Sequence, residues 1–145
     1  MVVEKAYLPA KTDRRMAIKV MHPVGKIVDD RGVIARLIDD DTLVFRGVLH
    51  ITSKKGSVRS NHYHKKDYHY LYVERGKCEY YEKEANNPNA KIESVSLAPG
   101  DLVLSKPGII HAVKFLEDSV IWAFTTEKRR QDTYEKDTIR VTIIK

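Results

Sequence analysis

The stretch of the chain over residues 56–76 constrains the possible fold more than any other part of the sequence. His62 and His64 are two residues apart in a segment typical of a β-strand, so both imidazoles point to the same face. A polar break at residues 65–67 separates this segment from a second one, in which His69 alternates with apolar residues. A hairpin formed by the two segments turns all three histidines toward one interior. We therefore expect a β-structure built around a cluster of imidazoles.

Short apolar or alternating segments, separated by turn-forming residues, fill the rest of the chain. The three aspartates at residues 39–41 read as one turn, and the loop at residues 84–90 is rich in turn formers. The other predicted strands cover residues 17–21, 33–38, 42–53, 77–83, 91–97, 102–105, 111–116, 120–126 and 138–144. No amphipathic helix longer than about two turns is predicted. Many short strands at regular spacing predict an all-β sandwich or barrel in a single domain.

Length and composition narrow the class of protein. A chain of 145 residues can bury a core of its own, and no apolar run approaches the ~20 residues that cross a bilayer. The first residues lack the apolar segment of a signal peptide. The single cysteine, Cys78, excludes an internal disulfide and fits a reducing compartment. We expect a cytoplasmic protein without a membrane partner.

The net charge of +6 bears on which class of ligand the protein binds. A basic surplus can mark a nucleic-acid-binding protein, but no zinc finger or helix-turn-helix pattern accompanies the basic clusters at residues 54–59 and 128–130. Acidic residues are also interleaved along most of the chain, as on an ordinary solvated surface. The charge therefore favours an anionic small substrate, such as a sugar phosphate or a nucleotide sugar, over nucleic acid.

A fourth histidine completes the predicted site. His111 follows a turn at Pro107 and Gly108. A single half-buried histidine is usually a hydrogen-bonded structural residue, and an H-x-H pair alone is weak evidence. That pair together with two further histidines in motif-like places is difficult to explain by chance. Because imidazole both binds metals and transfers protons near neutral pH, the cluster predicts a metal site or an acid–base site.

Two motifs of the chain resemble those of the cupin superfamily. The first cupin motif, G-x5-H-x-H-x(3,4)-E-x6-G, has its counterparts at Gly56, His62, His64, His69 and Gly76. The second motif, G-x5-P-x-G-x2-H-x3-N, has its counterparts at Gly100, Gly108 and His111. The resemblance implies an all-β cupin fold, a double-stranded β-helix or jelly-roll barrel. We expect residues 26–145 to form this barrel and residues 1–25 to form an N-terminal arm.

The chain departs from both cupin motifs at defined positions. His69 stands where most cupins have a glutamate ligand, and Phe115 stands where they have a final asparagine. Pro107 lies one residue late, with Lys106 in the usual proline position. Replacing glutamate by neutral histidine leaves the site one charge more positive, which favours an anionic substrate.

A closer resemblance is to the sugar-nucleotide cupins, namely the dTDP-sugar 3,4-ketoisomerases and the dTDP-4-dehydrorhamnose 3,5-epimerases. Its motifs are the D-x-R-G-like turn at residues 29–32, the R-G-x-H-like run at 59–62, the H-x-H-K-K run at 62–66 and the ending at 134–140. The tyrosine that the epimerases carry soon after a Thr-Thr pair is missing after Thr126. The resemblance therefore favours keto-isomerisation over epimerisation.

This resemblance implies roles for individual residues. His62 and His64 would carry protons through an enediolate, Arg59 would bind a substrate phosphate or oxyanion, and Tyr134 would assist. Strict alternation along a strand, however, places Arg59 on the face opposite to His62. Arg59 can join the site only if a bulge or loop lies between the two residues.

A metal site is the competing hypothesis. If His62, His64, His69 and His111 all bind a divalent transition metal, none of them can be the base. An all-imidazole site suits Zn, Fe, Ni, Cu or Mn. Iron in such a site would support a cupin oxygenase, and a third hypothesis is a cupin that binds a sugar or a metal without turnover.

Three tyrosines raise the question of a protein partner. Tyr68, Tyr70 and Tyr72 form a stripe on the strand face opposite to His69. In a thin barrel this face points outward, and an exposed aromatic stripe usually marks an interface. The stripe predicts a homodimer, with packing of the sheet inside the same chain as the alternative.

Overall fold

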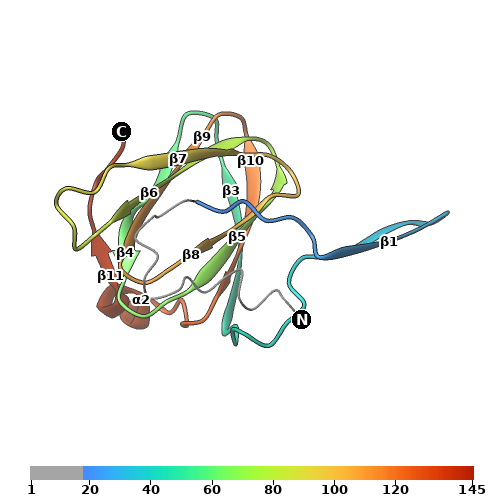
Figure 1. The fold of residues 1–145 in the computed structure, drawn as a ribbon, viewed down its shortest axis with the longest axis horizontal. Coiled ribbons are helices and arrows are strands. Elements are labelled where there is room, and N and C mark those ends of the chain that lie inside the picture. Colours follow the sequence, from blue (N-terminus) through green and yellow to red (C-terminus); the bar gives the residue numbers. More distant parts are fainter. Residues whose placement is uncertain (1–17) are drawn as a thin grey trace.

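The computed structural model describes residues 18–145, which form a barrel of two antiparallel sheets (Figure 1). The four-stranded sheet has the order β3 (Gly47–Ser53), β10 (Ser119–Thr125), β5 (His69–Arg75) and β8 (Leu102–Ser105). The five-stranded sheet has the order β11 (Thr138–Arg140), β4 (Val58–His64), β9 (Ile109–Phe115), β6 (Cys78–Glu84) and β7 (Glu93–Leu97). Apart from β6 and β7, strands that pair with each other in these two sheets are not consecutive in the sequence, as in a jelly roll. The predicted all-β fold is confirmed.

One short helix interrupts the strands in the described part of the chain. Helix α2 (Gln131–Asp137) lies between β10 and β11, directly after the basic cluster at residues 128–130, and the sequence analysis did not predict it. Gln131 Nε2 donates a hydrogen bond to Glu135 Oε1 at 3.0 Å, one helical turn away. Seven residues are too few for an apolar period to appear in the sequence. Nowhere in residues 18–145 is a helix long and apolar enough to span a membrane.

A separate hairpin precedes the barrel. Strands β1 (Gly25–Asp29) and β2 (Gly32–Arg36) pair with each other, and Figure 1 shows them extending away from the barrel. The predicted turn at residues 29–32 is present, with Gly32 at a φ of 141°. The barrel strands themselves begin at Gly47, and the predicted division into an arm and a barrel at residue 26 stays a prediction. Residues 1–17 of that arm lie outside the described residues.

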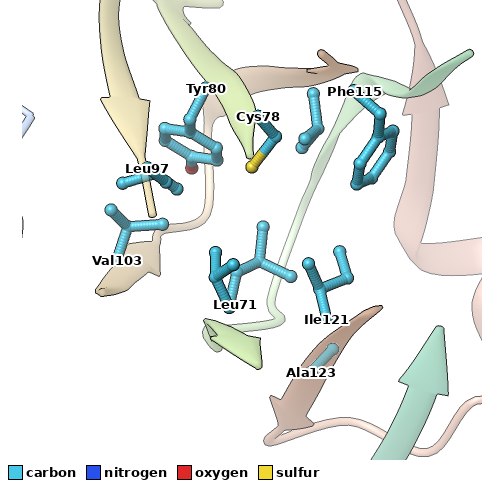
Figure 2. Packing of buried hydrophobic residues seen from close by; sticks show 10 residues of the cluster. Leu71, Cys78, Tyr80, Leu97, Val103, Phe115, Ile121 and Ala123 are labelled. Atoms are coloured by element: carbon cyan, nitrogen blue, oxygen red, sulfur yellow. The ribbon is translucent and has the colours of Figure 1, made fainter. Parts of the chain in front are cut away.

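The apolar core fills the space between the two sheets (Figure 2). Alternate residues of each strand point inward, so that β5 contributes Leu71 and Val73, and β6 contributes Cys78 and Tyr80. Leu97, Val103, Val113, Phe115, Ile121 and Ala123 complete this core. Cys78 is packed among apolar side chains, and burial raises its pKa to about 12, so it is an inert thiol. The histidines lie at one end of this apolar interior.

The outer face of the four-stranded sheet is covered by the chain itself. Tyr70 is only 1% exposed, and it packs in a second cluster with Met21, Leu102 and Leu104. The ring of Phe45 meets the ring of Tyr70 edge-on, with 5.8 Å between centroids. The prediction that the tyrosine stripe is exposed is therefore wrong at Tyr70, because residues 38–45 fold back over this face. A dimer through Tyr70 loses its basis, and the alternative of packing within the chain holds.

Candidate functional site

Three strands bring the four predicted histidines together. His62 and His64 are on β4, His69 is on β5 and His111 is on β9. The ring centroid of His62 lies 4.7 Å from the centroid of His64 and 4.7 Å from that of His111. The ring centroid of His69 lies 5.4 Å from that of His64 and 5.0 Å from that of His111. His62, His69 and His111 line a cavity of about 350 Å³ between the sheets, and His64 is buried beside them. A common cluster of all four imidazoles is the arrangement that the motifs predicted.

A β-bulge in β4 places Arg59 on the same side as His62. Arg59 is opposite Val113 and His62 is opposite His111, so Asn61 is an extra residue in the strand. Ser60 and Asn61 have φ angles of 71° and 55°, a backbone conformation that asparagine tolerates better than most residues. The bulge that Arg59 required is therefore present, and Arg59 lines the cavity.

Contacts on both sides hold the bulge and Arg59 in position. The side-chain oxygen of Asn61 accepts a hydrogen bond from the backbone N–H of Ile143 at 2.9 Å. The guanidinium of Arg59 donates to Ser53 Oγ at 2.7 Å and to the backbone oxygen of Thr52 at 2.9 Å. These bonds hold the side chain of Arg59 against β3 at the rim of the cavity.

Every histidine of the cluster has a polar partner at its Nδ1 atom. The pairs are His62 with Tyr134 Oη at 3.4 Å, His64 with Thr138 Oγ1 at 3.3 Å and Asp137 Oδ2 at 3.4 Å, His69 with Asp67 Oδ2 at 2.7 Å, and His111 with Ser105 Oγ at 3.0 Å. The Nε2 atoms are therefore the nitrogens left for a ligand. Nε2 of His64 is buried and has no hydrogen-bond partner within the chain. A buried polar atom without a partner in the chain is available to a water, an ion or a ligand.

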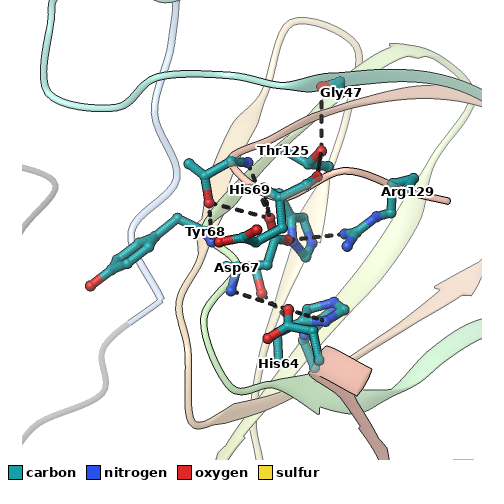
Figure 3. Close-up of polar contacts among 12 residues, drawn as sticks. Gly47, His64, Asp67, Tyr68, His69, Thr125 and Arg129 are labelled. Carbon is teal, nitrogen blue, oxygen red and sulfur yellow. Dashed lines mark hydrogen bonds and ion pairs between the residues drawn. The ribbon is translucent and has the colours of Figure 1, made fainter. Parts of the chain in front are cut away.

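The carboxylate of Asp67 anchors one side of the cluster (Figure 3). It is fully buried and accepts hydrogen bonds from the backbone N–H groups of Thr126 at 3.1 Å and Glu127 at 3.0 Å. It also accepts a bond from Nη2 of Arg129 at 3.0 Å. Burial raises the pKa of Asp67, but its hydrogen bond to His69 and the electrostatic effects of His69 and Arg129 outweigh burial and lower the pKa to about 2. Asp67 is therefore ionised and accepts the Nδ1 proton of His69.

Three of the imidazoles, those of His62, His64 and His111, are held in the neutral form. Burial, together with electrostatic repulsion from His69 and Arg129, lowers the pKa of His62 to about 4 and that of His64 to about 3. Burial likewise lowers the pKa of His111 well below its ordinary value. Neutral imidazoles carry a free lone pair, so these three rings can accept a proton or bind a metal at neutral pH.

Asp67 and Arg129 are site residues that the sequence analysis did not assign. Besides its bond to Asp67, Arg129 places its guanidinium 5.3 Å from the ring centroid of Tyr134. Its Nη1 atom is buried without a hydrogen-bond partner, and the side chain lines the cavity. The position of Asp67 two residues before His69 was the available signal for the first residue. Arg129 was visible only as one member of a basic cluster.

The donor atoms form two overlapping trios rather than one set of four. Among the His, Cys, Asp and Glu side chains of residues 18–145, two trios have possible metal-ligand atoms that all lie within 4.8 Å of one another. One trio is His62, His64 and His111, and the other is His64, Asp67 and His69. Their Nδ1 partners fix the ring orientations, as is usual for imidazoles that bind metals. The residues present therefore fit a transition metal, with His62, His64 and His111 as an all-imidazole set.

Comparison with known proteins gives the family of this chain. The model of the AraC-like ligand binding domain matches residues 47–137. The chain belongs to this family. The matched range contains the four histidines together with Arg59, Asp67, Arg129 and Tyr134. No curated protein matches the chain in sequence.

Solved structures resemble this AraC-like ligand binding domain in fold. The dTDP-4-dehydrorhamnose 3,5-epimerase from Sulfolobus tokodaii is 19% identical, with a TM-score of 0.74 over 90% of this chain and 80% of the other. A 3,4-ketoisomerase from Helicobacter canadensis is 17% identical, with a TM-score of 0.70 over 87% and 92%. A mutant 3,4-ketoisomerase from Thermoanaerobacterium thermosaccharolyticum, in complex with TDP-4-keto-6-deoxyglucose, is 20% identical, with a TM-score of 0.70 over 87% and 88%. These likenesses confirm the cupin fold that the two sequence motifs predicted.

Proposed function

We propose that this protein is an isomerase that acts beside the carbonyl group of a sugar, with a nucleotide sugar or a sugar phosphate as its substrate. The observation that carries the proposal is the cluster of four histidines at the cavity. Burial lowers the pKa values of His62, His64 and His111, so these rings are neutral at neutral pH. Neutral imidazoles at the cavity can take a proton from carbon and return it.

The reaction needs one base and one acid. A base removes the proton from the carbon next to the carbonyl group, and the electron pair of that C–H bond forms an enediolate. Returning the proton to the former carbonyl carbon, while the hydroxyl proton moves to the former carbonyl oxygen, completes keto-isomerisation. Returning it to the other face of the same carbon completes epimerisation. We assign the proton transfers to His62 and His64, with Tyr134 holding the ring of His62 through Nδ1.

Two arginines support an anionic substrate. Arg59 and Arg129 both line the cavity that the histidines occupy. A guanidinium binds phosphate through paired hydrogen bonds and stabilises an oxyanion as the charge develops. The mutant ketoisomerase of similar fold was solved with TDP-4-keto-6-deoxyglucose, which supports a nucleotide sugar as the class to test first.

A divalent metal is compatible with the same residues. His62, His64 and His111 would hold the ion through Nε2, because their Nδ1 atoms already have polar partners. A bound Zn, Fe, Ni, Cu or Mn ion supplies Lewis acidity toward a carbonyl group or a diol. A nitrogen bound to a metal cannot accept a proton, so in that state His62 and His64 are not bases at Nε2. His69, held by Asp67, is then the remaining imidazole.

A second candidate function is ligand binding without turnover. It is favoured by the family model, which describes a ligand binding domain and covers most of the barrel. The cavity, the two arginines and the buried Nε2 of His64 serve a bound sugar as well as a reacting one. The two functions differ in whether a C–H bond of the ligand is broken.

Solvent exchange distinguishes them. The protein is incubated with TDP-4-keto-6-deoxyglucose in D2O, and NMR follows deuterium uptake and the position of the keto group. The isomerase proposal expects deuterium beside the carbonyl, and His62→Asn or His64→Asn lowers the rate by about 10²–10⁴-fold. His50→Asn is the matched control, because this ring packs on Trp122 outside the cavity at 4.6 Å and should leave the rate unchanged.

The same samples separate the remaining alternatives. Binding by calorimetry without deuterium uptake contradicts the isomerase and supports the ligand-binding function. Neither binding nor uptake, with this compound or with UDP-sugars and sugar phosphates, contradicts a nucleotide-sugar ligand. Loss of uptake after chelation, with recovery after one metal is added back, supports the metal-dependent form.

We also propose a homodimer, whose interface is formed by a surface other than the three tyrosines. The β1–β2 hairpin carries the cross-strand pairs Ile27–Ile34 and Val28–Val33, and these four side chains are 59–71% exposed. A lone two-stranded hairpin is at best marginally stable in water, so these residues need a cover. Within residues 18–145, β3 is an edge strand of its sheet, and Val48 on β3 and Val44 before it are 60% and 70% exposed. We propose that the β3 edge of a second copy covers the hairpin. Each copy carries one hairpin and one β3 edge, so a two-fold symmetric dimer covers both hairpins.

A further inference from the structure

Arg59 lines a second hollow besides the cavity of the histidines. This hollow has a volume of about 500 Å³, and Arg59 is the one residue that it shares with the histidine cavity. Three segments that are distant in sequence build it, namely the turn between β3 and β4, the end of β5 and the turn between β9 and β10. We call it the basic hollow, because its lining includes the cationic side chains of Lys54, Arg59 and Arg75.

The charge of the lining is unbalanced. Against the three cations stands one carboxylate, that of Asp118. Asp118 Oδ1 accepts a hydrogen bond from the backbone N–H of Lys55 at 2.8 Å, so this carboxylate ties the two turns together. The lining keeps a surplus of two positive charges, which matches the charge of a phosphoryl group near neutral pH.

The chain supplies no counter-ions for these cations. The side chains of Lys54 and Arg75 are exposed, and within residues 18–145 they make neither a hydrogen bond nor an ion pair. Other arginines of the described chain do have a carboxylate partner, namely Arg31, Arg36, Arg129, Arg130 and Arg140. Like charges gathered at one hollow repel one another, so a bound anion lowers the energy of this arrangement.

The hydrogen-bond donors of the hollow are its cations rather than its hydroxyl groups. Ser57 Oγ donates to the backbone oxygen of Lys54 at 2.6 Å, and Ser119 Oγ donates to that of Glu117 at 2.8 Å, so both hydroxyl protons are used. The guanidinium of Arg59 is fixed by its bonds from Nε and Nη2 to β3, which leave the N–H groups of Nη1 for a ligand. A guanidinium that is already held loses little freedom when it binds an anion.

We propose that the basic hollow binds a phosphoryl group, with Arg59 and Arg75 as hydrogen-bond donors and Lys54 as a point charge. The group belongs either to free phosphate or to a larger ligand whose sugar lies in the histidine cavity, since Arg59 lines both spaces. The second source rests on the proposed function, whereas the binding of a phosphoryl group in the hollow does not.

Titration with three anions tests the proposal. Inorganic phosphate, pyrophosphate and TDP are added to ¹⁵N-labelled protein at low ionic strength, because salt screens exposed charges. NMR follows the backbone amides of Lys55, Ser57 and Ser119, which should shift and saturate, and calorimetry gives the dissociation constants. Arg75→Gln and Lys54→Gln should each weaken binding about tenfold. Both residues are exposed and unbonded within residues 18–145, so the variants should fold like the wild type.

Arg46→Gln is the matched control. Arg46 is an exposed arginine without a carboxylate partner in the described chain, and it donates to the backbone oxygen of Thr126 at 3.0 Å outside the hollow. Its loss removes the same charge from the protein and should leave the three dissociation constants unchanged. Equal weakening by Arg46→Gln and Arg75→Gln would mean that only the net charge attracts the anions, and it would overturn the proposal.

The remaining outcomes identify the source of the phosphoryl group. Phosphate that saturates the hollow while TDP binds no more tightly supports free phosphate. Tighter binding of TDP, weakened by Arg75→Gln, supports a larger ligand. Amides of the hollow that do not respond to any of the three anions, or TDP binding that Arg75→Gln leaves unchanged, overturn the proposal. No C–H bond is involved, so this failure leaves the isomerase proposal standing, and absent deuterium uptake does not contradict the hollow.

Discussion

The carboxylate of Asp67 lies 2.7 Å from Nδ1 of His69, and both side chains are buried. Two backbone N–H groups and Arg129 also bind this carboxylate, so it is the most heavily hydrogen-bonded acid of the described chain. The pair joins the end of β10 to the start of β5. It therefore serves the architecture of the cavity as well as the orientation of one imidazole.

Asp67→Asn should destabilise the protein strongly. The substitution leaves the buried side of Arg129 without its counter-charge and replaces an acceptor of His69 by an amide. Breaking a buried ion pair from one side costs about 3–5 kcal/mol, and the partial exposure of Arg129 places the expected loss at the lower end. The free energy of unfolding in urea measures it. Asp118→Asn, whose exposed carboxylate accepts one backbone bond from Lys55, is the control, and an equal loss in both variants would contradict this role.

Glu82 should make stability depend on pH. Burial raises the pKa of this carboxyl from 4.5 to about 7 in the folded protein. Between these values the folded state keeps a proton that the unfolded state has lost, so stability falls as the pH rises. The difference corresponds to at most about 3 kcal/mol. Urea unfolding at several pH values should therefore show that Glu82→Gln gains stability relative to the wild type as the pH rises from about 4.5 to 7. A constant difference between the two proteins across this window would refute the expectation.

Metal binding should depend on three of the four histidines more than on the fourth. His62, His64 and His111 share one trio of donor atoms, whereas His69 belongs to the trio that contains Asp67. Titration with Co²⁺, followed by its visible absorption, should show that His111→Gln loses binding and that His69→Gln retains most of it. His22→Gln, at an exposed histidine outside the cluster, is the control. Equal losses for His69 and His111 would favour the four-histidine site that the motifs predicted.

The hairpin should control the oligomeric state. Ile34→Asp on β2 and Val48→Asp on β3 each place a charge on one half of the proposed interface, and both should convert a dimer into a monomer. Sedimentation or light scattering measures the mass. Ile92→Asp changes an apolar residue that is 47% exposed away from both surfaces, and it should leave the mass unchanged. A wild-type protein that is monomeric at micromolar concentration, or variants that stay dimeric, would rule out this interface.

The alternation of residues predicted which side chains of β4 and β5 face inward, but the predicted hairpin of these two segments is wrong, because β4 pairs with β9 and β11 whereas β5 pairs with β8 and β10 in the other sheet. His62 and His64 share a face because side chains on a strand repeat every two residues, and His69 follows the same rule on β5. The spacing of glycines and of His111 carried the cupin resemblance, and the barrel followed from it. These features are local, so one sequence contains them.

Arg59 and Tyr70 show where local rules end. Alternation placed Arg59 outside the cavity, but the extra residue Asn61 reverses the face of everything before it in β4. Alternation correctly placed Tyr70 on the outer face of the sheet, yet that face is buried, because residues 38–45 pack over it. Neither the bulge nor the covering segment has a signature in the spacing of apolar residues.

The sequence by itself determined which side chains share a face within each regular stretch of strand, because strand geometry there depends only on neighbours along the chain. The tertiary structure alone decided what each imidazole can do. Asp67 and Arg129 are 62 residues apart, and the partners of His64 come from the last strand and the helix before it. Charge, tautomer and pKa at the cluster depend on these long-range contacts and on burial. Both are set only when the two sheets close on each other.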